Sequence, residues 1–168
     1  MGLSGLSGLG GRAGLGGLLP GVIAAIDIPA MTGRSTPAPY VVSESSFVNE
    51  RPGWLAFNQD NDSWVTSNGD VSSAHITIDL GDIYKISELT VWASNNDPSR
   101  MPTSWRLLGS LDGVSYTEFH VQSSYVIPGL LQPGPTITFT PVEYRHVRFE
   151  VNSVNGGFRS SVSRLAYK

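Results

Sequence analysis

Apolar and polar residues alternate along several short stretches in the second part of the chain. In HITIDL (75–80) every second residue is apolar, and later segments such as HVRFEV (146–151) repeat this pattern. A period of two residues is typical of a β-strand that buries one face and exposes the other. We therefore expect a series of half-buried strands. The alternating stretches are residues 75–80, 86–94, 105–110, 136–140 and 146–151.

Turn signals separate these stretches. They are LGD at 80–82, NNDP at 95–98, DG at 112–113, PGP at 133–135 and NGG at 155–157. Glycine, proline, asparagine and aspartate favour such positions because they adopt or stabilise turn conformations. No convincing helical period interrupts the series. Several short strands joined by such turns predict an all-β sandwich or barrel.

The first 39 residues have a different pattern. Glycine recurs at every third position, and leucine fills much of the space between: Gly2, Gly5, Gly8, Gly11, Gly14 and Gly17. A period of three fits an extended left-handed helix with three residues per turn, with the leucines along another edge. A collagen-like homotrimer and a flexible low-complexity tail are the alternatives.

We expect residues 1–39 to form an extended, non-globular anchoring arm and linker. Within it, the apolar residues 22–31 would dock on another surface, and residues 32–39 (TGRSTPAP) have the composition of a linker. The arm would bind other subunits of a multiprotein assembly through residues 1–31, or form a homo-oligomer. Residues 40–168 would then form one β-sandwich domain.

Composition excludes several classes of function. Hydrophobic residues make up 40% of the 168 residues, which is enough to build a core. A net charge of −3 gives no attraction to phosphate backbones and argues against nucleic acid as a partner. The chain has no cysteine, so disulfides, thiol nucleophiles and cysteine-based zinc sites are excluded. Extracellular binding modules often carry disulfides, so the absence of cysteine indicates either assembly in a bacterial cytoplasm or a fold that relies on packing alone.

Targeting and membrane segments are not expected either. No apolar run approaches the roughly 20 residues that a transmembrane helix needs. Residues 15–30 resemble the core of a signal peptide, but Met1 lacks the basic flank of such a peptide, and Gly and Pro interrupt the run.

Charge is distributed unevenly along the domain. Seven acidic residues and one lysine lie between residues 58 and 97, whereas five basic residues and one glutamate lie between residues 144 and 168. We expect these two stretches to neutralise each other within one fold.

Four passages resemble the discoidin, or coagulation factor V/VIII type C, family. AFNQDNDSW (56–64) looks like the family's Ala-Leu-Asp-Gly-Asp loop ending in Thr-x-Trp, and HITIDLG (75–81) like its strand ending in Asp-Leu-Gly. WRLLGSLDGVSYTEF (105–119) matches its aromatic-led strand followed by Ser-x-Asp-Gly, and YRHVRFEV (144–151) its late Arg-Tyr-Val-Arg strand. The resemblance implies a galactose-binding-like jelly-roll β-sandwich. It also places Trp64 and Trp105 at core positions.

Two residues at the end of the HITIDLG passage have roles that physical chemistry suggests directly. The Asp79 side chain is placed to cap the turn that leaves the strand. Gly81 permits a backbone angle that other residues resist.

The resemblance also implies a candidate calcium site, since many family members bind a structural calcium ion in the loop that matches residues 56–64. By position the ligands are Asp60 and Ser63, with Asp62 as an extra acid. The family's closing glutamate is replaced by Arg164. A guanidinium cannot ligate calcium, but it can neutralise an acidic loop. We therefore expect Arg164 to pair with Asp60 or Asp62 in place of the ion, with a retained ion as the alternative.

Family members bind ligands with loops at one end of the sandwich, and here the loops are residues 67–73, 94–101 and 155–159. A sugar needs planar hydrogen-bonding groups and an aromatic ring for the apolar face of the pyranose. The alternative is that the NNDP residues only make a turn and that Phe158 belongs to the core. A hydrophobic tip at residues 126–131 (VIPGLL) is a weaker candidate for membrane contact. The candidate ligand-binding residues are Asn95, Asn96, Asp97, Arg100, Phe158 and Arg159.

Catalytic motifs are absent from the sequence. His75, His120 and His146 stand in no metal-ligand spacing such as HExxH, and no G-x-S-x-G elbow occurs. A glycosidase needs only a pair of carboxylates in a cleft, which sequence alone does not exclude. Because the family that the chain resembles consists overwhelmingly of binding domains, we expect a binding domain and not an enzyme.

Two hypotheses of function follow. In the first, the domain is a carbohydrate or cell-surface recognition module on the surface of a larger particle, where many copies would amplify weak binding. In the second, it is an assembly or decoration protein without a free ligand. A cysteine-free sandwich on an N-terminal arm resembles the tail, fibre or capsid-decoration components of bacteriophage virions. Exposure of the loops at 94–101 and 155–159 in the assembled particle would favour the first hypothesis, and their burial there would favour the second.

Overall fold

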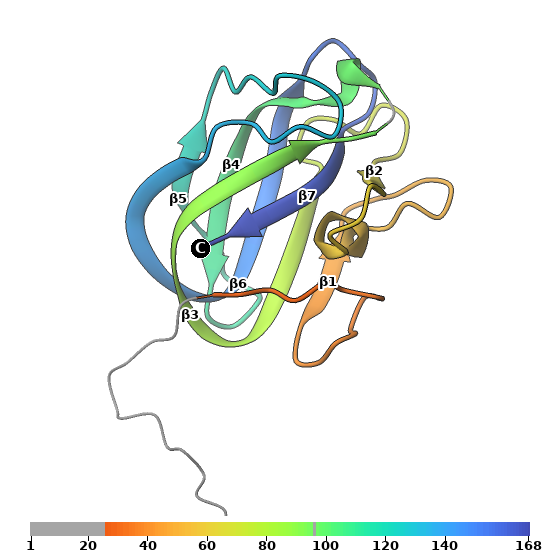
Figure 1. The fold of residues 1–168 in the computed structure, drawn as a ribbon. Helices are drawn as coiled ribbons and strands as arrows, with labels where there is room; N and C mark the ends of the chain where they lie inside the picture. The colour runs from red at the N-terminus through yellow and green to blue at the C-terminus, as the bar shows by residue number, and fades with distance from the viewer. Residues whose placement is uncertain (1–25, 96) are drawn as a thin grey trace, which may run out of the picture.

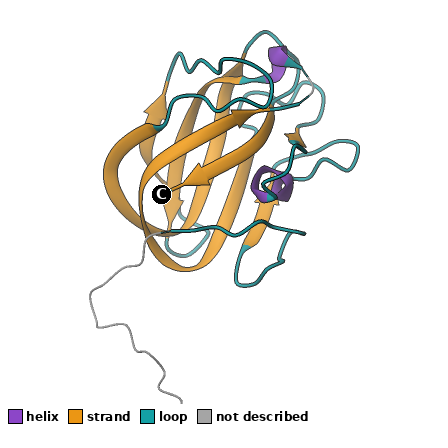
Figure 2. Ribbon diagram, viewed as in Figure 1, coloured by secondary structure: helices purple, strands orange, loops and turns teal. Residues whose placement is uncertain are grey.

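The computed structural model of the protein describes residues 26–95 and 97–168. Residues 1–25 of the predicted arm and the candidate ligand residue Asn96 lie outside this part. Strands dominate the described residues, which confirms the all-β prediction (Figures 1 and 2). No helix in these residues is long and apolar enough to cross a membrane. The elements are β1 (Val41–Glu44), η1 (Gly53–Phe57), β2 (Trp64–Val65), β3 (His75–Ala93), η2 (Pro98–Arg100), β4 (Pro102–Ser110), β5 (Thr117–Gln122), β6 (Ile137–Val154) and β7 (Ser161–Tyr167).

Two long antiparallel strands, β3 and β6, bend together and belong to both layers of the sandwich (Figure 1). The first half of β3 pairs with β1, and the second half of β6 pairs with β4, which continues to β5. The second half of β3 pairs with β7, which continues to β2. Because each long strand turns back on itself, both of its ends lie at the same end of the molecule.

The bend joins stretches that were predicted as separate strands. The stretch at 136–140, from Ile137 onward, and the stretch at 146–151 both belong to β6. Residues 75–80 and 86–94 were predicted as separate strands with a turn at 80–82, but they are the two halves of β3. Between the pairs Asp79–His146 and Tyr84–Tyr144, β3 contains residues 80–83 where β6 contains only Arg145. The chain therefore turns through a bulge, which keeps the ladder to β6.

Asp79, Gly81 and Arg145 hold this bend. The Asp79 carboxylate accepts a hydrogen bond from the Gly81 amide at 2.8 Å, as predicted, and pairs with Nε and Nη2 of Arg145 at 2.8 and 2.9 Å. Gly81 has φ of 81°, and a Cβ atom there would lie 2.4 Å from Cβ of Pro39. Arg145 and the Gly81 amide hold the pKa of Asp79 below its usual value.

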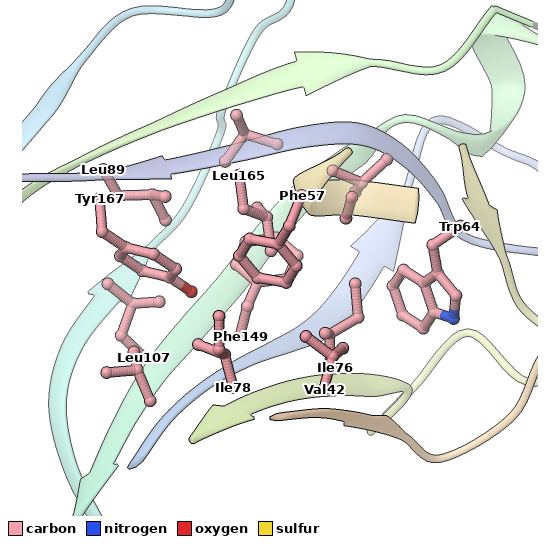
Figure 3. Close-up of a cluster of buried hydrophobic side chains, with 14 of the residues drawn as sticks. Val42, Phe57, Trp64, Ile76, Ile78, Leu89, Leu107, Phe149, Leu165 and Tyr167 are labelled. Carbon is pink, nitrogen blue, oxygen red and sulfur yellow. The ribbon is translucent and has the colours of Figure 1, made fainter. Parts of the chain in front are cut away.

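The core fills the space between the two layers (Figure 3). Ile76, Ile78 and Phe149 face it from one layer, and Leu89 and Leu165 face it from the other. Ile76, Ile78, Phe149 and Leu89 occupy apolar positions of the predicted alternating stretches, so the prediction of their inward faces is confirmed. Leu165 lies in β7, which the alternation did not predict. The two tryptophans assigned to the core by family resemblance, Trp64 and Trp105, are also fully buried.

Residues 26–39, predicted to be docking segment and linker, pack on the domain itself. Ile26 and Met31 belong to the core cluster, and the Met31 amide donates to the Phe57 carbonyl at 3.0 Å. The Arg34 guanidinium pairs with the Glu44 carboxylate of β1. This part of the predicted arm therefore contacts its own chain.

The Asp79–Arg145 pair predicts how stability changes with pH. Because the pKa of Asp79 is lowered in the folded protein, its contribution is complete above the unfolded-state pKa near 4 and is lost as pH falls through the folded-state pKa. We expect Asp79→Asn to lower the free energy of unfolding by about 1 kcal/mol at pH 7, and the deficit to disappear in acid. Urea titrations between pH 7 and pH 2 measure both effects.

The control is Asp60→Asn, because the Asp60 carboxylate is exposed and makes no ion pair with any residue that the structure describes. A constant difference between Asp79→Asn and wild type across the pH range would contradict this account of the bend.

Candidate functional site

Three loops meet at the end of the sandwich opposite the bend. They are residues 66–74 between β2 and β3, residues 94–101 with η2, and residues 155–160 between β6 and β7; the last two lie together at the top of Figure 1. They surround an open pocket of about 360 Å³. These are the loops that the sequence analysis selected. The pocket is lined by Asn68, Asp97, Ser99, Arg100, Gly156, Gly157, Phe158 and Arg159.

Asp97 organises the middle loop. Its Oδ1 accepts hydrogen bonds from the backbone amide and the hydroxyl of Ser99, at 2.9 and 2.7 Å, and so caps η2. Its Oδ2 lies 3.3 Å from Nε of Arg100. The Ser99 hydrogen bonds, followed by the Arg100 charge, lower the pKa of Asp97. Asp97 is therefore ionised at neutral pH, and its main role is to hold the loop and to orient Arg100.

Backbone hydrogen bonds connect the last loop to η2. The Gly157 amide donates to the Ser99 carbonyl at 2.9 Å, and the Asn155 amide donates to the Met101 carbonyl at 3.0 Å. A Cβ atom on Gly157 would lie 2.7 Å from the Ser99 carbonyl oxygen. Only glycine permits the two backbones to approach this closely.

The first loop is connected in the same way. The Gly69 amide donates to the Phe158 carbonyl at 2.8 Å, and the Thr66 amide donates to the Ser160 carbonyl at 3.0 Å. On its other side, the Ser46 hydroxyl donates to the carboxylate of Asp70. The loops therefore brace one another, and the pocket is largely formed before any ligand arrives.

Phe158 is the exposed aromatic residue of the site. Its side chain is 78% exposed, although a phenyl ring is ordinarily buried. The alternative assignment of Phe158 to the core is therefore wrong. Its backbone is held by Gly69, so the ring stands on a braced loop at the edge of the pocket.

The structure brings together four of the six candidate ligand residues: Asp97, Arg100, Phe158 and Arg159 all line the pocket. Asn95 does not, because its Oδ1 accepts from the buried Ser63 hydroxyl at 3.5 Å. Asn96 lies outside the described residues.

Asn68 and Ser99 also line the pocket, although neither was among the predicted site residues. Asn68 precedes Gly69 in a loop that was named only as a range, and the Asn-Gly pair was its only signal. Ser99 contributes through its contact with Asp97, which sequence spacing alone does not reveal.

A smaller pocket of about 230 Å³ adjoins the first. Val48, Asn49 and Val65 line it together with three arginines. Arg100 and Arg159 line both pockets, and Arg51 lines only the smaller one. Arg51 also pairs with Asp62, at 3.2 Å between Nη1 and Oδ1.

The side chains of the candidate calcium site have different surroundings. Asp60 and Asp62 are exposed, and Asp62 pairs with Arg51, while the Ser63 hydroxyl is buried against Asn95. Calcium needs six to eight oxygen ligands, usually including several carboxylates. The described residues contain no group of three or more histidine, cysteine, aspartate or glutamate side chains that could hold a metal ion.

The expected pairing of Arg164 with this loop is wrong. Arg164 lies opposite Trp92 in the β3–β7 ladder, so both side chains project from the same face of the sheet. The Arg164 guanidinium stacks over the Trp92 ring, 4.9 Å from its centroid, and makes no ion pair with Asp60 or Asp62.

The sequence model of the F5/8 type C domain matches residues 41–164. No curated protein sequence matches the chain significantly. Among solved structures, the module CpGH89CBM32-5 from Clostridium perfringens, in complex with GalNAc-β-1,3-galactose, has a TM-score of 0.67 and 19% identity over 76% of this chain and 94% of that chain.

Two further structures share this jelly-roll fold. A family 32 carbohydrate-binding module of NanJ from C. perfringens, in complex with galactose, has a TM-score of 0.64 and 17% identity over 76% of this chain and 92% of that chain. The family 32 module of AlyQ, in complex with 4,5-unsaturated mannuronic acid, has a TM-score of 0.62 and 20% identity over 76% of this chain and 93% of that chain.

The geometry of the 58–63 loop predicts that calcium does not change the thermal stability of the protein. We expect the melting temperature to be the same, within error, in millimolar calcium and in excess chelator, because no carboxylate cluster is available to gain from the ion. Differential scanning calorimetry of the full chain makes this comparison. If calcium clearly raises the melting temperature and Asp60→Asn abolishes this increase, the loop binds the ion.

Proposed function

Because the chain belongs to the F5/8 type C domain family, we propose that it is a non-catalytic carbohydrate-binding module whose ligand occupies the pocket between its three loops. The observation that carries the proposal is the exposed ring of Phe158 beside the side chains of Asn68 and Arg100. Similar modules in complex with galactose, with a galactosyl disaccharide and with an unsaturated mannuronic acid support it.

The chemistry of the pocket suits a pyranose. The apolar face of the sugar ring would stack on Phe158, where the ring is available without displacing other side chains. Asn68 and Arg100 would direct hydrogen-bond donors at the sugar oxygens, and the Asn68 amide also offers an acceptor.

The same pocket lacks the pair of carboxyl groups that glycoside hydrolysis ordinarily uses, among the residues that the structure describes. That reaction ordinarily needs two carboxyl groups on either side of the glycosidic bond. Asp97 is the only carboxylate among the described lining residues, and it is engaged by Ser99 and Arg100. We infer binding without turnover.

Display on a larger assembly is the second part of the proposal. The Gly-x-x repeat from Gly2 to Gly17, with its leucines, supports attachment of the domain to other subunits, for example in a phage tail, fibre or capsid decoration. Many copies on one particle would raise a weak single-site affinity. In the alternative role, as a decoration protein without a free ligand, the three loops would be covered by neighbouring subunits.

A glycan array tests the binding function. We expect the full chain, multimerised on a carrier, to bind a defined class of sugar, and Phe158→Ala to weaken binding by about fivefold, because a stacked ring contributes about 1 kcal/mol. The control is Val114→Ala. Val114 is 82% exposed and lies in the turn between β4 and β5, at the far end of β4 from the pocket.

Equal loss of binding in both variants would argue against Phe158 as the platform. A blank array from well-folded protein would contradict the recognition role and favour decoration.

A further inference from the structure

The charge of the pocket wall is the feature that the general proposal leaves unexplained. We define the arginine cluster as Arg51, Arg100 and Arg159, which come from three separate loops and line the two adjoining pockets. Three guanidinium groups gathered at one end of a chain whose net charge is −3 are not a consequence of overall composition.

Two members of the cluster are neutralised locally. Arg51 pairs with Asp62 at 3.2 Å, and Arg100 pairs through Nε with Asp97 at 3.3 Å. Arg159 has no ion pair, hydrogen bond or aromatic contact with any other described residue, although it is only partly exposed. The cluster therefore has one uncompensated positive charge, located at Arg159.

Arg159 is unusual in this molecule. Every other arginine of the described residues has a partner on the protein, either a carboxylate, a hydroxyl or an aromatic ring. These are Arg34 with Glu44, Arg51 with Asp62, Arg100 with Asp97, Arg106 with Glu118 and Glu150, Arg145 with Asp79, Arg148 with Thr77 and Tyr116, and Arg164 with Trp92.

The carboxylates near the pocket are also engaged by other groups. Oδ1 of Asp97 is taken by the amide and hydroxyl of Ser99, and the Asp70 carboxylate of the neighbouring loop accepts from Ser46. Arg159 and Arg100 both line the pocket, and neither the Arg159 guanidinium nor the Nη groups of Arg100 have an acceptor among the described residues. A ligand that satisfies them has to supply acceptor atoms, and it gains most if those atoms carry negative charge.

We propose that the sugar bound here is acidic: a uronic acid whose carboxylate pairs with Arg159, assisted by Arg100, while its ring stacks on Phe158. The proposal rests on the carbohydrate-binding function stated above and assigns the class of sugar. The planar fork of a guanidinium matches a carboxylate through two parallel hydrogen bonds, which a neutral hydroxymethyl group cannot reproduce. Phe158 and Arg159 are adjacent in sequence, so one braced loop presents both groups.

Matched ligands test the charge directly. The affinity of the full chain is measured by calorimetry for trimers of galacturonate, glucuronate and mannuronate, for their methyl esters, and for the corresponding neutral hexose trimers. Methyl esterification keeps the ring and removes the charge. We expect at least one uronate to bind tenfold or more tightly than its ester, with a preference that decreases as salt increases.

Matched variants locate the effect. Arg159→Gln should reduce the ratio of uronate to ester affinity to near one, and Arg159→Lys should retain part of it, since lysine keeps the charge but loses the fork. Arg164→Gln removes the same charge from a residue that stacks on Trp92 and lines neither pocket, so it should leave the ratio unchanged.

The outcomes separate this inference from the function on which it rests. Equal affinity for uronates and esters, or a preference that survives Arg159→Gln, overturns the acidic-sugar assignment. If neutral sugars bind equally well and Phe158→Ala weakens their binding, the carbohydrate-binding function stands and the assignment fails. If folded protein binds none of these sugars, both fail.

Discussion

The ion pair between Asp79 and Arg145 lies at the bend on which the arrangement of the molecule depends. It connects β3 and β6 where both strands turn from one layer of the sandwich into the other. The bulge at this point lies in β3, and Gly81 adopts a positive φ within it. Because both long strands return to the end from which they started, the loops at their ends gather there (Figure 1). The position of the candidate site is thus a consequence of a bend at the opposite end.

The site itself depends on backbone contacts between loops and not on a framework of charged side chains. Gly157 meets Ser99, and Gly69 meets Phe158, so the three loops support one another through amide–carbonyl hydrogen bonds. Such bracing lowers the entropy cost of binding, because the aromatic ring is already placed. It also leaves the guanidinium of Arg159 free to contact a ligand, since no described side chain competes for it.

Much of the fold could be predicted because the alternation of apolar residues depends only on local period, and residues such as Phe149 and Leu89 faced the core as expected. The continuity of β3 could not be predicted, since a glycine turn and a glycine bulge look alike in sequence. The pocket residues Asp97, Arg100, Phe158 and Arg159 were found by their type within turn-rich loops, and the resemblance to a family supplied the loops.

Other features could not be predicted from the sequence. The stacking of Arg164 on Trp92 depends on the register of β7 against β3, and that register is set by the whole sandwich. Asn68 and Ser99 enter the pocket through contacts between distant loops. The packing of residues 26–31 on the domain was also missed, because a short apolar segment has the same composition whether it docks on its own chain or on another.

The most direct test of the central claim is an amide chemical-shift titration of the isotope-labelled full chain with galactose and with galacturonic acid. The account predicts shifts concentrated at the amides of Gly69, Gly157, Phe158 and Arg159, which belong to the braced loops, and larger shifts with the acid. Shifts at the opposite end of the sandwich, around Val114, or none with either sugar, would contradict it.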